Sequence, residues 1–169
     1  MSEQQDVAAG SGAVVVGVDD SPGGRAALTA ALDEAGRRGA PVVAVLAYDT
    51  PELWALELGA DPIMNNAELH RQVTRVAARL VDEVVADADD AHLPEVRVLA
   101  RAGSAADVLC RVEREAALLV VGHRGRGALA TRLIGSVGLG VVVHATCPVL
   151  VVRPAPAASA PPAPPVPAG

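Results

Sequence analysis

The chain has 169 residues, of which 51% are hydrophobic but only 1% aromatic, and its formal net charge at pH 7 is −6. This length allows one domain with a large aliphatic core, as in a parallel sheet buried on both faces by helices. The negative charge excludes a general basic surface for nucleic acid, and the scarcity of aromatic side chains argues against a platform for single strands.

The first elements are predicted from an apolar run and its flanking residues. Residues 1–12 are expected to form a disordered lead, and residues 13–18 a first strand. Ser21 is suited to cap a helix that begins at Pro22 and ends near Gly39. A second strand is predicted at residues 41–47.

A long helix is predicted after an irregular segment. Residues 48–64 contain two prolines and a glycine, so we expect no more than a short helical turn there. Residues 66–88 keep the three-four spacing of a helix with one buried face. The predicted buried residues are Leu69, Val73, Val76, Leu80 and Val84.

The second half of the chain alternates strands and helices. Alternation predicts a half-buried strand at residues 95–101. Ser104 and Asp107 resemble a capping box at the start of the next helix. The remaining elements are a strand at residues 118–121, a helix at 136–144 and a strand at 148–152, followed by a proline-alanine tail at 154–169 that is expected to be extended and mobile.

This order of elements predicts the fold and the position of its site. Strands that alternate with helices, joined by right-handed crossovers, form an open parallel α/β sheet. Ligands of such sheets lie beyond the carboxyl ends of the strands, where the strand order reverses. Asp19, Ala47-Tyr48 and Gly122 all stand at predicted carboxyl ends.

A loop rich in glycine and arginine follows the strand at 118–121. Such a loop presents backbone N–H groups to a phosphate. No carboxylate follows Glu115, whereas Arg124, Arg126, Arg132 and Arg153 do, which indicates an anionic ligand.

Two common nucleotide motifs do not fit this loop. All fourteen basic residues are arginines, so the chain has no lysine for a Walker P-loop or for Schiff-base chemistry. Residues 125–130 match G-x-G-x-x-A, but no acid follows about twenty residues later to bind a ribose, so the dinucleotide fingerprint is weak.

Another spacing fits better. Two residues separate Gly122 from Gly125, and nine separate Gly125 from Gly135-Ser136. With the segment from Val16 to Pro22 and the segment from His144 to Val152, this G-2x-G-9x-G-S pattern resembles the universal stress protein family. The resemblance covers residues 13–153.

The resemblance implies a strand order of 3-2-1-4-5 and a site for ATP between the first and fourth strands. It assigns Asp19 to the ribose and the backbone of Ala47 to adenine. The implied phosphate contacts are Gly122, Gly125, Gly135, Ser136 and Val137. Arg124 or Arg126 is able to add charge-assisted hydrogen bonds to the phosphates. Mg²⁺ is able to accompany ATP through the phosphates and Asp19 or Asp20. Gly138 departs from the family, in which serine is frequent at this position.

The resemblance also implies a homodimer. In the order 3-2-1-4-5 the last strand lies at an edge, and an unpaired hydrophobic edge is a liability. The family pairs this strand across a two-fold axis, so we expect a dimer through Val149–Val152.

The leading functional prediction is an ATP-binding stress-response and signalling module. Because no secretory signal or membrane span is visible and the two cysteines form no C-x-x-C pair, we expect a cytoplasmic protein without membrane partners. The alternatives are a slow ATPase or phosphoryl-transfer enzyme, and a dimeric interaction protein that binds no nucleotide. The stress, the protein partner and the role of residues 48–64 stay open.

Overall fold

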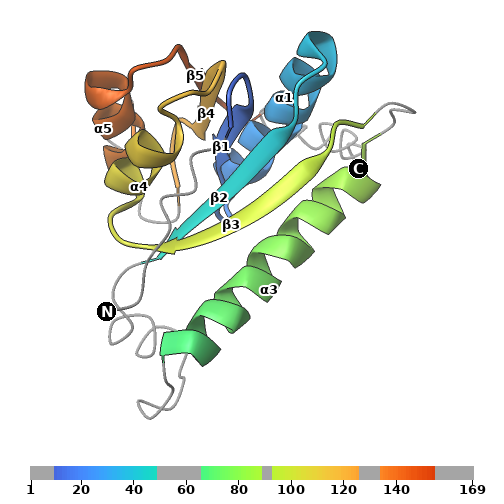
Figure 1. Cartoon of the computed structure of the whole chain (residues 1–169), viewed down its shortest axis with the longest axis vertical. Helices are drawn as coiled ribbons and strands as arrows, with labels where there is room; N and C mark the ends of the chain where they lie inside the picture. The colour runs from blue at the N-terminus through green and yellow to red at the C-terminus, as the bar shows by residue number, and fades with distance from the viewer. Residues whose placement is uncertain (1–9, 49–65, 89–92, 126–133, 155–169) are drawn as a thin grey trace, which may run out of the picture.

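Five parallel strands form one sheet in the order β3-β2-β1-β4-β5, which confirms the predicted topology (Figure 1). The computed structural model describes residues 10–48, 66–88, 93–125 and 134–154. The expected lead, the irregular segment before the long helix and the tail lie wholly or mostly outside these residues. The strands are β1 (Val14–Gly17), β2 (Val42–Tyr48), β3 (Val96–Ala102), β4 (Leu118–Gly122) and β5 (Val149–Val152).

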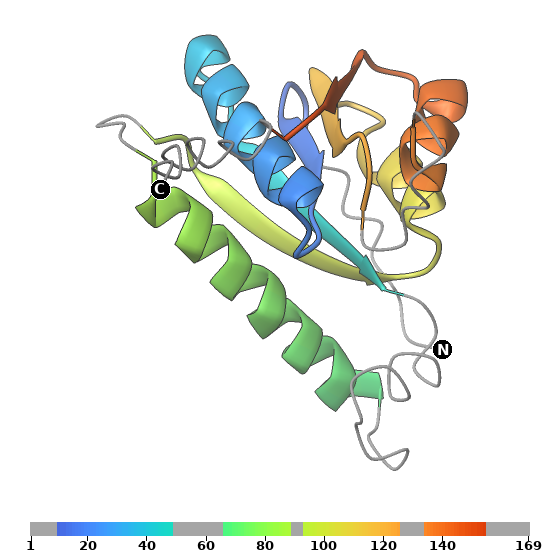
Figure 2. The same cartoon turned by 180° about the vertical axis from the view of Figure 1, so that it is seen from behind.

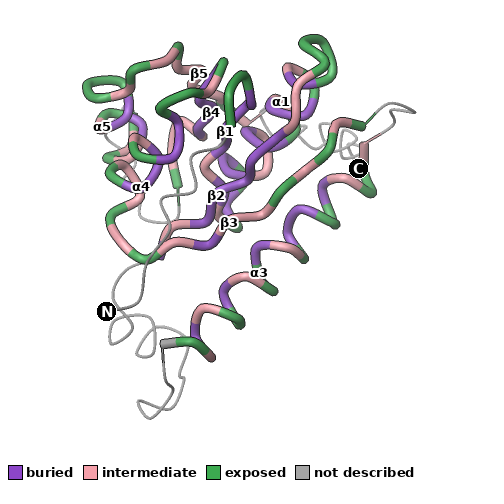
Figure 3. The backbone as a smooth tube through the Cα atoms, viewed as in Figure 1, coloured by how far each residue is buried: buried purple, intermediate pink, exposed green. Residues whose placement is uncertain are grey.

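Helices cover both faces of the sheet because both sets of alternating strand residues are apolar. Val14 and Val16 of β1 pack on the side of α1 (Pro22–Arg38) and α3 (Asn66–Ala86), whereas Val15 packs on the opposite side. That side is covered by α4 (Ala105–Val112) and α5 (Ser136–His144) (Figures 1 and 2). Figure 3 shows the central strands buried along most of their length. The crossovers therefore position the carboxyl ends of all strands at one edge of the molecule.

Helix α1 begins and ends as predicted. Ser21 has an extended backbone, and its Oγ accepts a hydrogen bond of 3.0 Å from the backbone N–H of Gly24. Pro22 occupies the first turn, where it needs no N–H partner. Gly39 ends the helix with φ at +61°, in the left-handed region that glycine adopts without a steric penalty.

Two predicted details are wrong. Val76 is 40% exposed, because the buried face of α3 runs through Ala77 and Val81 instead. The capping box at Ser104 and Asp107 is absent, since α4 has no side-chain cap. Asp107 is one methylene shorter than the glutamate or glutamine of a complete box, so its reach is shorter.

A buried carboxylate joins the end of α4 to the loop before β5. Glu113 is fully buried and accepts hydrogen bonds from Thr146 N (2.9 Å), Thr146 Oγ1 (3.1 Å) and Cys147 N (3.2 Å). Burial raises the pKa of Glu113, but the hydrogen bonds from Cys147 and Thr146 outweigh burial and hold this pKa below its ordinary value. Burial, followed by Glu113, raises the pKa of the Cys147 thiol to about 12, so Cys147 stays protonated.

Candidate functional site

A cavity of about 370 Å³ lies at the carboxyl ends of the strands, next to the point between β1 and β4 where the strand order reverses. The structure brings all eight site residues predicted from the sequence to its wall. They are Asp19, Ala47, Gly122, Arg124, Gly125, Gly135, Ser136 and Val137.

The start of α1 is pressed against the end of β4, and glycines make this approach possible. A Cβ at Gly122 would lie 2.7 Å from the backbone C and O of Gly23. A Cβ at Gly23 would lie 2.2 Å from the carbonyl oxygen of Arg124. None of Gly122, Gly125 and Gly135 has a positive φ. Any need for glycine at these three positions therefore comes from the space available for a Cβ and not from the backbone conformation.

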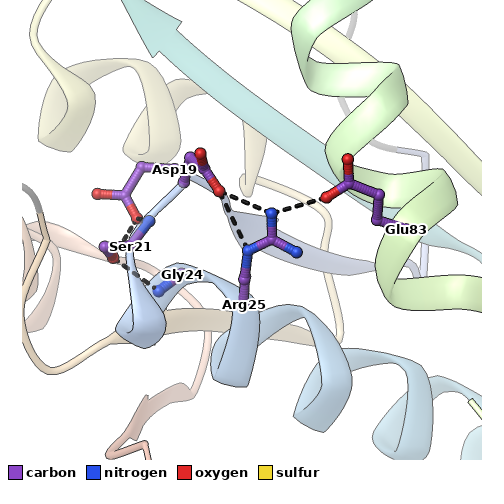
Figure 4. Close-up of polar contacts among 6 residues, drawn as sticks. Asp19, Ser21, Gly24, Arg25 and Glu83 are labelled. Atoms are coloured by element: carbon purple, nitrogen blue, oxygen red, sulfur yellow. Dashed lines mark hydrogen bonds and ion pairs between the residues drawn. The ribbon is translucent and has the colours of Figure 1, made fainter. Parts of the chain in front are cut away.

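Asp19 lies between the first turn of α1 and the glycine loop. Its Oδ1 accepts hydrogen bonds from the backbone N–H and the Oγ of Ser21, so Asp19 helps to order the helix cap (Figure 4). A Cβ on Gly125 would lie 2.6 Å from Asp19 Oδ2, which places this carboxylate beside the loop. Asp19 thus supports the cap of α1 and also lines the cavity.

The N-terminus of α5 faces the cavity without a side-chain cap. The first intrahelical hydrogen bond runs from Leu139 N to Gly135 O at 2.9 Å. The N–H groups of Ser136, Val137 and Gly138 precede it and have no acceptor within the helix. All three residues line the cavity, where their N–H groups and the helix dipole favour an anion.

Gly135 contributes room at this end of the cavity. Its N–H donates to the carbonyl oxygen of His123 at 2.8 Å and is therefore already engaged. A Cβ at Gly135 would have its nearest neighbours, Arg124 Cα and His123 O, at 3.5 Å, which is ordinary contact.

His123, which follows Gly122 at the start of the loop, is half-buried. Its Nδ1 is buried and has no hydrogen-bond partner in the described part of the chain. Burial, then the charges of Arg124 and Arg153, lower the pKa of His123, which keeps the ring neutral at pH 7. Among the described residues, no group of three His, Cys, Asp or Glu side chains is arranged to hold a metal ion.

The opposite end of the cavity is apolar. Ala47, Val76 and Leu109 line it together with Tyr48, which is 7% exposed. The Tyr48 hydroxyl lies 3.1 Å from His70 Nδ1, and burial raises the pKa of Tyr48 while Arg101 lowers it. Tyr48 was placed with Ala47 at a carboxyl end but was not predicted as a site residue, and Val76 was predicted only as a buried residue of the long helix. The position of Tyr48 directly after Ala47 is a signal that pointed to it.

The comparisons with a family model and with curated relatives agree on one family. The model of the universal stress protein family matches residues 11–153. A universal stress protein of Mycolicibacterium smegmatis is 35% identical over 143 residues, which are 83% of this chain and 45% of the relative. Universal stress protein Rv2005c of Mycobacterium tuberculosis is 36% identical over 141 residues, again 83% of this chain and 45% of the relative. The chain therefore spans about half the length of these curated relatives.

Solved structures share the fold. A universal stress protein in complex with cAMP superimposes with a TM-score of 0.57 at 24% identity, over 86% of this chain and 98% of that one. Protein MJ0577 superimposes with a TM-score of 0.62 at 18% identity, over 86% of this chain and 98% of that one. A universal stress protein from Archaeoglobus fulgidus in complex with dAMP superimposes with a TM-score of 0.51 at 21% identity, over 83% of this chain and 96% of that one.

Proposed function

The chain belongs to the universal stress protein family, and from this premise we propose that it binds ATP and acts as a nucleotide-dependent signalling module in the cytoplasm. The family model covers most of the chain, and the curated relatives carry the same family name. None of the described helices combines the length and the apolar composition needed to cross a bilayer.

One observation carries the proposal: the eight predicted site residues line a single cavity whose character changes along its length. The apolar end at Ala47 suits the adenine base. The carboxylate of Asp19 is able to accept hydrogen bonds from ribose hydroxyls. The N-terminus of α5 and the nearby Arg124 suit the phosphates. The cAMP and dAMP held by two related structures support a nucleotide as the class of ligand.

Mg²⁺ fits this proposal only as a companion of the nucleotide. The described residues contain no ready-made metal cluster, and Asp20 is already paired with Arg25 at 2.8 Å. Magnesium commonly binds through substrate phosphates and one or two carboxylates. In this chain Asp19 is the carboxylate that lines the cavity.

Bound nucleotide is the direct test. Freshly purified protein is denatured, and the small molecules that it releases are identified by mass spectrometry. We expect ATP, together with saturable ATP binding to the emptied protein in calorimetry. Absence of both a released nucleotide and measurable binding would favour the alternative of an interaction protein without nucleotide. Turnover of ATP by the pure protein would favour the alternative of an enzyme.

We further propose that β5 forms the interface of a homodimer. β5 pairs only with β4 among the described strands, so its other edge is unpaired within this part of the chain. Pro148 O and Val152 O accept hydrogen bonds from Leu119 N and His123 N of the neighbouring chain segment. Because strand residues alternate, the backbone groups of Val149 and Val151 point to the outer edge.

Val151→Pro is therefore expected to convert the dimer to a monomer with the fold retained. Proline removes an outward N–H that a partner strand needs, but no hydrogen bond to β4. The mass is measured by light scattering, and circular dichroism checks the fold. A folded variant that is still fully dimeric would rule out pairing through this edge. Both Leu150 and Val151 pack against the core, but Leu150 is a poorer position for the proline because its N–H faces β4.

A further inference from the structure

A second cavity, of about 530 Å³, forms a groove between the start of α1 and the middle of α3. We call it the arginine groove. It includes Asp20 and Arg25 from the α1 side, and Arg75, Val76, Arg79 and Glu83 from α3. Because Arg75 and Arg79 are four residues apart, they lie on the same side of α3, one turn from each other.

The two carboxylates of the groove already share one arginine. Arg25 Nη2 lies 2.8 Å from Asp20 Oδ1 and 2.7 Å from Glu83 Oε2, so its guanidinium links the start of α1 to α3 (Figure 4). Neither Arg75 nor Arg79 forms a hydrogen bond or an ion pair with another described residue. The groove is thus lined by three arginines and two carboxylates. Outside the groove, Arg71, helped by the charge of Arg75, lowers the pKa of Glu68, but the two arginines on α3 have no hydrogen-bonded partner among the described residues and are available to an anion.

The groove is next to the proposed nucleotide cavity. Val76 lines both the groove and the cavity. Asp19 and Asp20 are consecutive residues, of which Asp19 lines the cavity and Asp20 the groove. A ribose that binds at Asp19 therefore has the groove beside it, whereas the phosphates on its 5′ side extend toward α5.

We propose that the arginine groove binds a second phosphate group, attached to the 2′ or 3′ oxygen of the ribose. The preferred ligands are then adenine nucleotides with a phosphate on each side of the ribose. This inference rests on the proposed adenine nucleotide in the cavity. The negative charge of Asp19 repels a phosphate on the ribose. The ribose keeps one free hydroxyl that is able to donate to Asp19, and the positive charges of Arg75 and Arg79 attract the phosphate on the other oxygen.

Calorimetry with three probes tests the proposal. AMP, adenosine 3′,5′-bisphosphate and adenosine 2′,5′-bisphosphate carry the same base and 5′-phosphate and differ only in the second phosphate. At least one bisphosphate is expected to bind at least about tenfold more tightly than AMP. In the double variant Arg75→Gln, Arg79→Gln the ratio of the affinity for that bisphosphate to the affinity for AMP is expected to fall to about one.

Arg71→Gln is the matched control. It removes one of the two positive charges that the double variant removes, but from one turn earlier in the same helix, at a residue that pairs with Glu68 and does not line the groove. This variant should keep the preference for the bisphosphate. Equal affinities in the unaltered protein, or a preference that survives in the double variant, would overturn this inference alone. If none of the three probes binds although ATP does, this inference alone is overturned, whereas absence of ATP binding as well contradicts the proposed function and this inference with it.

Discussion

Replacing Gly135 by aspartate is expected to lower the affinity for ATP about a hundredfold or more while the protein stays folded. Gly135 is the cap residue of α5, whose first N–H groups face the cavity. A carboxylate there occupies the position proposed for a phosphate and repels it. At about 5 Å and an effective dielectric constant of about 20, two unit charges repel by about 3 kcal/mol, which is roughly a hundredfold in affinity.

The same substitution suits the helix itself. Gly135 has φ at −68° and ψ at 165°, the extended conformation that is usual for a cap residue. A Cβ would meet no atom closer than 3.5 Å. Aspartate is at least as good a cap as glycine, so the free energy of unfolding is expected to stay equal or to rise by a few tenths of a kcal/mol.

Calorimetry with ATP and thermal unfolding by circular dichroism separate the two effects. Gly135→Asn is the control, because asparagine caps a helix equally well and has the same shape without the charge. The asparagine variant should lose much less affinity than the aspartate variant. If Gly135→Asp binds ATP as tightly as the unaltered protein, the phosphates do not bind at α5. Gly122→Ala would not answer this question, since its Cβ collides with the backbone of Gly23 and disturbs the fold.

The ends of α1 could be predicted because local patterns determine them, whereas the strand order was implied by the resemblance to the universal stress protein family. Apolar residues on both faces of β1, β2 and β4 indicate a sheet that is covered twice. Ser21, Pro22 and Gly39 each act within their own turn of helix. The spacing of the glycines helped to predict the cavity wall because it carried the resemblance to the family, and that resemblance also assigned Asp19 and Ala47 from other parts of the chain.

The features that were missed depend on contacts between distant segments. Arg25 and Glu83 are 58 residues apart in the chain, and the buried partners of Glu113 lie 33 and 34 residues away. No local spacing reports such a pair. The exposure of Val76 also depends on which residues of α3 turn toward the sheet, and the spacing of apolar residues alone did not separate Val76 from Ala77 and Val81.

Removing the carboxylate of Glu113 is expected to be the most destabilising single change among the polar residues discussed. Glu113→Ala leaves the N–H groups of Thr146 and Cys147 without their acceptor beside the core. Breaking such a buried arrangement costs about 2–4 kcal/mol. Urea unfolding followed by circular dichroism at a fixed protein concentration measures the loss, and Glu113→Gln, which keeps one acceptor oxygen, should lose less.

The charge of Glu113 also predicts how this loss depends on pH. The pKa of Glu113 in the folded protein lies below the ordinary value of 4.5, because the hydrogen bonds from Cys147 and Thr146 favour the ionised form. The stabilisation by the charge is therefore complete above that ordinary value and disappears as the pH falls through the lower folded pKa. The difference in unfolding free energy between the unaltered protein and Glu113→Gln should be constant near neutral pH and shrink below about pH 4.5. A difference that stays the same down to pH 3 would show that the carboxylate acts only through its shape, since a neutral side chain would then serve Thr146 and Cys147 equally well.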